Sequence, residues 1–139
     1  MNDDPRYILD EQVGFVLRRV TQRHLAIFSA AIPELTTTQF TTLAKLHELG
    51  PLSQNHLGRV TAMDGATIKG VVDRLTRQGL VQTSPDPDDR RRLTVSLTDA
   101  GRMSYELAEP RAAQVTEATL DPLTERERAQ LMTLLLKLV

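Results

Sequence analysis

One stretch, residues 52–101, constrains this 139-residue chain more than any other. Within it, apolar residues recur at i, i+3, i+4 and i+7, which predicts an amphipathic helix over 64–78 whose buried stripe is Ile68, Val71, Val72 and Leu75. The opposite helix face is small, hydroxyl-bearing or charged, and a loop with three arginines follows the helix. A polar helix face beside an arginine-tipped loop is the combination that a DNA-binding protein needs, with one element for a groove and one for the backbone.

The segments around this helix predict two further helices and a hairpin. A capping box at Thr36 and Gln39 begins a helix that Gly50-Pro51 ends, and Ser53 is a natural N-cap for a short helix through Val60. Alternating apolar and polar residues predict strands over 80–84 and 92–97, joined by a Pro- and Asp-rich loop. Three helices followed by strand, loop and strand within 36–97 form a winged helix-turn-helix.

Long amphipathic helices are predicted outside this unit, over 7–30, 99–120 and from 124 onward. Pro110 should kink or split the second of them. A unit of about 50 residues does not need three more helices to cover it, so we expect them to pair two copies around a two-fold axis. The alternative is that they complete a monomeric core.

The fold class that follows is mainly α with a small β-hairpin wing. A winged helix-turn-helix DNA-binding region is expected over 35–98, and a helical dimerisation region over 1–34 and 99–139. The low aromatic content of 4% also favours helices over a β-sandwich.

The distribution of charge agrees with a DNA-binding centre. The formal net charge of the chain is −1, but residues 53–98 carry seven Lys or Arg against five Asp or Glu, which makes this the only positive third. A local basic patch on a nearly neutral protein is compatible with duplex binding, because the field close to the phosphates matters more than the total.

Other classes of function find little support. There is no cysteine, which excludes disulfides, thiolate chemistry and zinc-finger sites, and no apolar run approaches a membrane span. His24, His47 and His56 fall on three different predicted helices, and the acidic loop lacks the ligand spacing of an EF-hand. We therefore expect that the protein binds no metal ion and no cofactor and that it is not an enzyme. The N-terminus does not read as a signal peptide, and the expected compartment is the cytoplasm.

The chain also resembles the MarR family of bacterial transcription regulators. The likeness extends over nearly the whole chain, and its most specific part is the wing. The matching runs are Leu35-Thr36-x-x-Gln39-Phe40-x-x-Leu43, Leu52-Ser53-Gln54-x-x-Leu57-Gly58, Met63-Asp64-x-Ala66-Thr67-Ile68-x-x-Val71-Val72-Asp73-Arg74-Leu75-x-x-x-Gly79-Leu80-Val81 and Asp86-Pro87-x-Asp89-Arg90-Arg91-x-Leu93-x-Val95-x-Leu97-Thr98-x-x-Gly101.

The resemblance implies a homodimeric repressor on a pseudo-palindromic operator, with the helix 64–78 in the major groove and the wing near the minor groove. Small residues let the helix approach base edges, Lys69 reaches guanine or a phosphate, and Arg74 contacts a phosphate or pairs with Asp73 or a wing aspartate. Asp89 is expected to pair with a wing arginine and to shape the turn. The candidate DNA-contacting residues are Ser53, Gln54, Gly65, Ala66, Thr67, Lys69, Arg74, Arg90 and Arg91.

The resemblance further implies that a small molecule, often an aromatic acid or a phenol, releases the DNA from a site between the dimerisation helices and the winged region. Such a site needs apolar walls and a cation or donor for a carboxylate. The candidate ligand-binding residues are Phe15, Arg19, His24, Phe28, Phe40 and His47; the alternative is that the phenylalanines are core and Arg19 is surface. The alternative function is a winged helix that binds a partner protein and no DNA.

Overall fold

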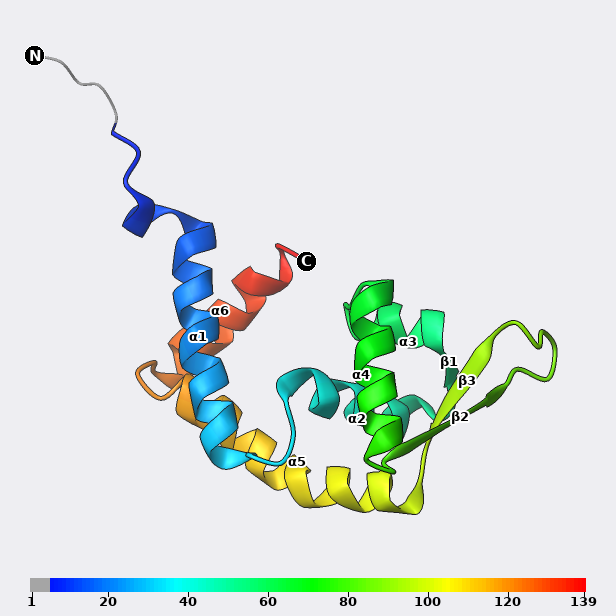
Figure 1. Cartoon of the computed structure of the whole chain (residues 1–139). Helices are drawn as coiled ribbons and strands as arrows, with labels where there is room; N and C mark the ends of the chain where they lie inside the picture. Colours follow the sequence, from blue (N-terminus) through cyan, green and yellow to red (C-terminus); the bar gives the residue numbers. More distant parts are fainter. Residues whose placement is uncertain (1–5) are drawn as a thin grey trace, which may run out of the picture.

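The computed structural model describes residues 6–139. A winged unit and a helical arm lie at opposite ends of the molecule, joined by the long helix α5 (Asp99–Thr119) (Figure 1). The winged unit comprises α2 (Thr37–Leu49), β1 (Leu52–Ser53), α3 (Gln54–Val60), α4 (Gly65–Arg77), β2 (Val81–Pro85) and β3 (Leu93–Leu97). The arm comprises the short 3-10 helix η1 (Leu9–Glu11), α1 (Val13–Ala31) and α6 (Glu125–Leu136). The expected fold class is therefore confirmed.

Side-chain caps set the starts of the helices where the sequence predicts them. The Thr36 hydroxyl accepts the Gln39 N–H at 3.2 Å, and the Gln39 side chain accepts the Thr36 N–H at 3.0 Å, which completes the predicted capping box of α2. Thr124 and Glu127 repeat this arrangement at α6. Ser53, Asp64 and Thr98 cap α3, α4 and α5 in the same way, each through one side-chain oxygen.

The sheet has three antiparallel strands in the order β1-β3-β2, one strand more than the sequence predicts. Strand β1 is only two residues long, and it pairs Leu52 with Val95 and Ser53 with Thr94. Two residues are too few to show an alternating pattern, so this strand follows from pairing and not from a local signal. The pairing brings the start of α3 beside the base of the wing.

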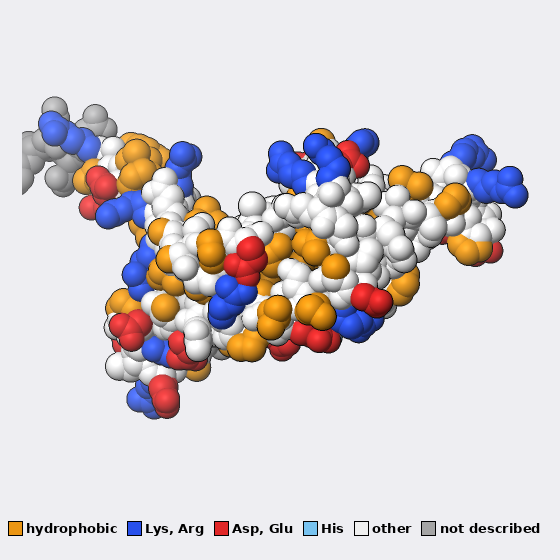
Figure 2. All heavy atoms as spheres, turned by 60° about the horizontal axis from the view of Figure 1, so that its bottom comes forward, with side chains coloured by type: hydrophobic (Ala, Val, Ile, Leu, Met, Phe, Trp, Pro, Cys, Tyr) orange, Lys and Arg blue, Asp and Glu red, His pale blue; other side chains and the backbone are white. Residues whose placement is uncertain are grey.

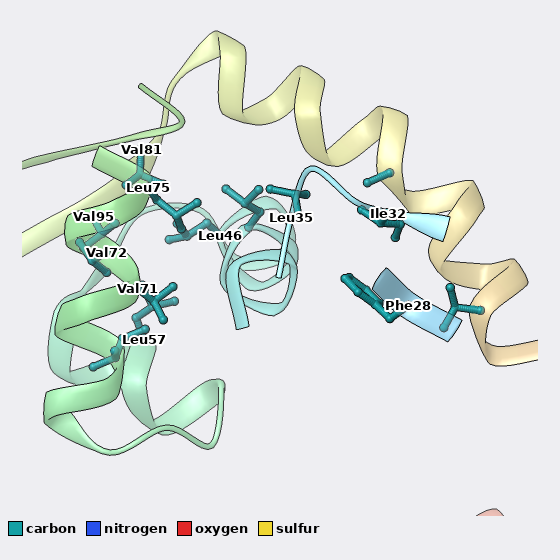
Figure 3. Close-up of a cluster of buried hydrophobic side chains, with 14 residues drawn as sticks. Phe28, Ile32, Leu35, Leu46, Leu57, Val71, Val72, Leu75, Val81 and Val95 are labelled. Atoms are coloured by element: carbon teal, nitrogen blue, oxygen red, sulfur yellow. The ribbon is translucent and has the colours of Figure 1, made fainter. Parts of the chain in front are cut away.

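The core of the winged unit is continuous with the end of the arm (Figure 3). All four residues of the predicted α4 stripe are buried, none with more than 4% of its surface exposed. Leu35 and Leu46 lie between this stripe and the arm residues Phe28 and Ile32 (Figure 3). Leu49, which helical spacing also places inward, is 47% exposed, because α2 ends there and the chain turns at Gly50.

Helix α5 is anchored at both ends. At its start, Gly101 packs against the connection between α4 and β2, so closely that an added Cβ would lie 1.8 Å from the Leu80 carbonyl oxygen. The Thr98 hydroxyl also donates to the Gly79 carbonyl of this connection at 2.6 Å. Just past its middle, Arg111 donates to the Ala31 carbonyl at 3.0 Å and to the Glu34 carboxylate. At its end, the carbonyls of Ala118 and Thr119 accept from the Arg23 guanidinium at 2.9 and 3.1 Å. The Arg111 guanidinium lowers the pKa of Glu34. These contacts fix the arm and the winged unit relative to α5.

Two expectations about the flanking helices are resolved. Helix α5 stays a single helix through Pro110 but changes direction along its length, so the predicted kink forms and the split does not (Figures 1 and 3). The first long helix begins at Val13 and not near Tyr7, after the separate turn of η1. The part of the expected region 1–34 that precedes Arg6 lies outside the described residues. Within residues 6–139, no helix is both long and apolar enough to cross a membrane.

Candidate nucleic-acid interface and effector pocket

The first turn of α4 presents small side chains to the outside. Because Ile68 and the rest of the stripe face inward, Gly65, Ala66 and Thr67 are all exposed. The Asp64 carboxylate accepts the Thr67 N–H at 2.7 Å, and this backbone hydrogen bond is the main cause of the lowered pKa of Asp64. The cap holds the helix start rigid and leaves room for another molecule to approach its backbone.

The basic residues of α4 differ in what they contact. The Lys69 ammonium lies 3.0 Å from the Asp73 carboxylate, so Asp73 pairs with Lys69 and not with Arg74. Arg74 is exposed and forms no ion pair with any residue in 6–139. Arg77, which was not among the candidates, is exposed on the next turn and donates to the Asp73 carbonyl at 3.4 Å.

The acidic residues of the wing shape its turn. The carboxylates of Asp86 and Asp89 accept the N–H groups two residues on, from Asp88 at 2.8 Å and from Arg91 at 3.0 Å. Asp89 also lies 3.6 Å from the Arg91 guanidinium and 3.8 Å from that of Arg92, so its expected pairing with a wing arginine is confirmed. Over the described part of the chain, no group of three or more His, Asp or Glu is placed to hold a metal ion.

A polar hollow of about 150 Å³ lies between the start of α3 and the base of the wing. Its lining brings together three candidates from different elements, Ser53, Gln54 and Arg91, and adds Asn55, Arg92 and Leu93. The Ser53 oxygen accepts the His56 N–H at 3.2 Å, which leaves its O–H proton available to a further acceptor. Arg90 does not line the hollow, and the wing carries exposed basic side chains at its far end (Figure 2).

Asn55 and Arg92 are absent from the candidate DNA-contacting residues, because their spacing in the sequence gave no reason to place them at one site with Ser53 and Arg91. The pairing of β1 with β3 creates the hollow, and two-residue strands have no readable period. The three consecutive arginines indicated a basic wing. Which of them line the hollow depends on the backbone hydrogen bonds that Arg92 forms with Asp86 and Asp89.

A second hollow, of about 240 Å³, lies between the arm and the winged unit. Three ligand candidates, His24, Phe28 and Phe40, line it, and the rings of the two phenylalanines are 5.9 Å apart in an edge-on arrangement. The remaining lining residues are Thr37, Thr41, Ala112, Val115 and Thr116. Apolar walls with a few hydroxyls and one imidazole suit a small aromatic molecule that carries polar groups.

His24 is held at the wall of the hollow by a hydrogen bond with Thr119. Its Nδ1 lies 2.9 Å from the Thr119 hydroxyl oxygen, and the same hydroxyl lies 2.8 Å from the Val115 carbonyl oxygen. The imidazole therefore links α1 to α5, and its other ring nitrogen can donate to or accept from a polar ligand, depending on the tautomer.

The other three ligand candidates lie elsewhere. Phe15 and Arg19 precede His24 on α1 by more than one helical turn and do not line the hollow. His47 packs its ring 4.6 Å from that of Tyr105 and lies 3.6 Å from the Glu106 carboxylate, at the contact between α2 and α5. Burial is the main cause of the raised pKa of Tyr105. His47 follows Phe40 by seven residues on the same side of α2, and both rings pack on Tyr105. Its position two turns farther along the helix, and not its side, keeps it out of the hollow.

Comparison with known proteins agrees with this geometry. The family model described as "MarR family" matches residues 35–93. The chain is 45% identical over 139 residues to the HTH-type transcriptional repressor NicR of Pseudomonas putida, an alignment that covers 99% of this chain and 88% of NicR. The chain belongs to the MarR family. It is therefore a DNA-binding transcription regulator, as the resemblance implied.

Solved MarR-family structures share the fold closely. A probable transcriptional regulator from Pseudomonas aeruginosa has a TM-score of 0.92 and 50% sequence identity, covering 95% of this chain and 100% of that one. Bordetella bronchiseptica BpsR, described with the regulation of its DNA binding by 6-hydroxynicotinic acid, has a TM-score of 0.91 and 42% identity and covers 96% of both chains. The MarR family is a family of transcription regulators, which points away from an enzyme, and the description of BpsR by its DNA binding gives no support to a protein-binding winged helix.

Proposed function

We propose that this MarR-family protein is a homodimeric repressor that binds a pseudo-palindromic operator in the cytoplasm. The region 35–98 binds the DNA, and the regions 1–34 and 99–139 pair the two copies. That NicR is named a repressor supports repression rather than activation. The dimer is supported by the exposed apolar side chains of the arm, including Val13, Val16 and Leu134. Two α4 helices related by a two-fold axis can then meet successive major grooves about 34–36 Å apart.

The proposed DNA contacts fall into three groups. The exposed start of α4, with Gly65, Ala66 and Thr67, enters the major groove, and Lys69 reaches a guanine or a phosphate from the next turn. Ser53, Gln54 and Arg74 contact phosphates. Arg90 and Arg91 reach the minor groove, whose negative potential attracts arginine. The observation that carries this assignment is the hollow where Ser53, Gln54 and Arg91 meet.

The test is to replace Arg91 by alanine. We expect weaker operator binding and a salt dependence, d log K/d log [salt], that is smaller in magnitude by about 0.9, because one positive charge that displaces counterions from the DNA is lost. Fluorescence anisotropy at several salt concentrations measures both, and circular dichroism checks the fold. Arg126→Ala, which removes an equal charge from exposed α6, is the matched control. An Arg91→Ala variant that behaves like this control would remove the wing from the interface.

Lys69→Ala separates the two roles that Lys69 can have. A loss confined to operator DNA marks a base contact, whereas an equal loss on operator and unrelated duplexes marks a phosphate contact. Measuring both duplexes in the same buffer decides between them.

We further propose that the hollow lined by His24, Phe28 and Phe40 binds a small aromatic acid that relieves repression. The regulation of BpsR by 6-hydroxynicotinic acid supports the class of hydroxylated ring acids. The location supports the mechanism, because a ligand between α1, α2 and α5 touches both the arm and the winged unit. It would favour one relative placement of the two α4 helices over another.

Titration of the protein–operator complex with 6-hydroxynicotinic acid tests this proposal, with nicotinic acid as the matched compound lacking the hydroxyl. We expect DNA release and a raised melting temperature with the first compound. Phe40→Leu should weaken the response, while Phe15→Leu, outside the hollow, should not. Recovery of the ligand chemically unchanged is expected for a regulator that is not an enzyme. Equal loss of response in both variants would place the site elsewhere.

A further inference from the structure

Helix α4 carries an acidic side chain on the face that is proposed to meet DNA. Asp73 lies one turn after Lys69 on the exposed side of the helix, opposite the buried stripe that includes Val71 and Val72. The side chains of Asp73 and Lys69 are 49% and 65% exposed, and their charged atoms are 3.0 Å apart. A carboxylate in this position repels the phosphates that a DNA-binding helix must approach.

The Asp73 carboxylate has no structural task in the described part of the chain. Its one hydrogen bond is the contact with Lys69, and the carboxylate neither caps a helix nor bridges two elements. Asp89 in the wing differs, since it also accepts the Arg91 N–H and so shapes the turn. Removing the Asp73 charge should therefore leave the fold intact.

The ion pair changes what Lys69 offers to DNA. A free ammonium on α4 would be attracted to any phosphate, whatever the sequence, and would raise binding to all duplexes alike. A paired ammonium brings no net charge, so it adds little to this general attraction. Exposed ion pairs are weak, however, so an acceptor that is well placed on a base edge can draw Lys69 away from Asp73.

We infer that Asp73 is a specificity-determining residue that keeps Lys69 in an ion pair when the protein meets non-operator DNA. On unrelated sequences the pair stays closed, and α4 contributes little phosphate attraction. On the operator, Lys69 exchanges the carboxylate for base acceptors. Asp73 thus lowers the affinity for unrelated DNA more than the affinity for the operator, which raises the ratio between the two. The inference rests on the proposed placement of α4 against DNA.

The experiment compares the wild-type protein with Asp73→Asn on an operator duplex and on an unrelated duplex over a range of salt concentrations. We expect the variant to bind unrelated DNA severalfold more tightly, with a salt slope steeper by about 0.9, because Lys69 now neutralises one phosphate. Operator affinity should rise less, so the ratio of the two affinities should fall. Adding Lys69→Met to Asp73→Asn should return the slope to the wild-type value.

Glu48→Gln is the matched control, because it removes the same charge from the exposed Lys45–Glu48 pair, 3.3 Å apart on α2. If Glu48→Gln and Asp73→Asn had equal effects, the change in affinity would come from the net charge of the protein alone, and the inference would be overturned. An unchanged slope, or a loss confined to the operator, would also overturn it, the latter by showing that Asp73 itself reads a base. If Arg91→Ala still weakens binding in those cases, the interface stands without this role for Asp73.

Discussion

Helices α4 and α6 have similar lengths, 13 and 12 residues, but bury different amounts of apolar surface. Four side chains of α4 are buried, whereas α6 buries none and leaves Leu134 and Leu136 57% and 64% exposed. Helix α1 resembles α6, since Phe28 is its one buried residue among 19. The winged unit therefore holds most of the buried core, while the arm leaves apolar residues exposed, which the proposed dimerisation would cover.

The largest expected effect contrasts a core leucine with an arm leucine. Leu75 is fully buried in the winged unit, so Leu75→Ala should lower the free energy of unfolding by about 2–5 kcal/mol. Urea denaturation followed by circular dichroism measures this value. Leu136→Ala on α6 is the matched control, and at protein concentrations too low for dimerisation it should change this free energy by less than about 0.5 kcal/mol. Comparable losses in the two variants would mean that the two regions do not differ as described.

The next effect concerns the association of two copies. Leu134→Ala should weaken dimerisation by about 1–3 kcal/mol, because the Leu134 side chain, exposed in one copy, becomes buried at the proposed interface. Sedimentation equilibrium over a range of concentrations measures the dissociation constant. The exposed Leu49 at the end of α2, outside the proposed dimerisation regions, serves as the control through Leu49→Ala. A wild-type protein that remains monomeric at all concentrations would refute the comparison itself.

The two capping boxes allow a finer test, because they are chemically alike and lie in different regions. Thr36→Ala and Thr124→Ala should each cost about 1 kcal/mol of helix stability. The Thr36 loss should appear at every protein concentration, while the Thr124 loss should appear as a concentration-dependent melting temperature. Scanning calorimetry at two concentrations distinguishes them, and identical behaviour would show that the arm folds as part of the winged unit.

The smallest effect is the pH dependence of the Glu34–Arg111 contact between the regions. Arg111 lowers the pKa of Glu34 in the folded chain, so the folded state binds fewer protons than the unfolded state between the two pKa values. The contact therefore stabilises the protein above the unfolded value of about 4.3 and loses this contribution as the pH falls through the folded pKa. Glu34→Gln should lower the melting temperature at pH 7 by less than either cap variant, and the difference from wild type should vanish at low pH.

Local signals in the sequence predicted the parts of the fold that local interactions determine. The caps at Thr36 and Ser53 and the stripe of α4 need only residues three or four positions apart, and all of them form. Strand β1 was not predicted, because its partner lies about 40 residues away in the chain and two residues show no period. Pairing between distant segments decides such elements.

The candidate sites divide in the same way. Ser53, Gln54 and Arg91 line one hollow, but Arg92 joins them in place of Arg90, which depends on the hydrogen bonds of the wing turn. In the second hollow, His24, Phe28 and Phe40 come together, but His47 lies against Tyr105 and Glu106. Residue type indicated the chemistry, and the packing of α2 on α5 decided which residues share one space.

Helix α5 has a consequence for the DNA that the protein selects. It runs about 15 Å from Gly101 to Arg111, where it meets the arm, with no loop to absorb a change in its length. One inserted residue would turn everything beyond it by about 100° and shift it by about 1.5 Å. In a dimer joined through its arms, the length of α5 is thus a ruler that fixes the spacing between operator half-sites.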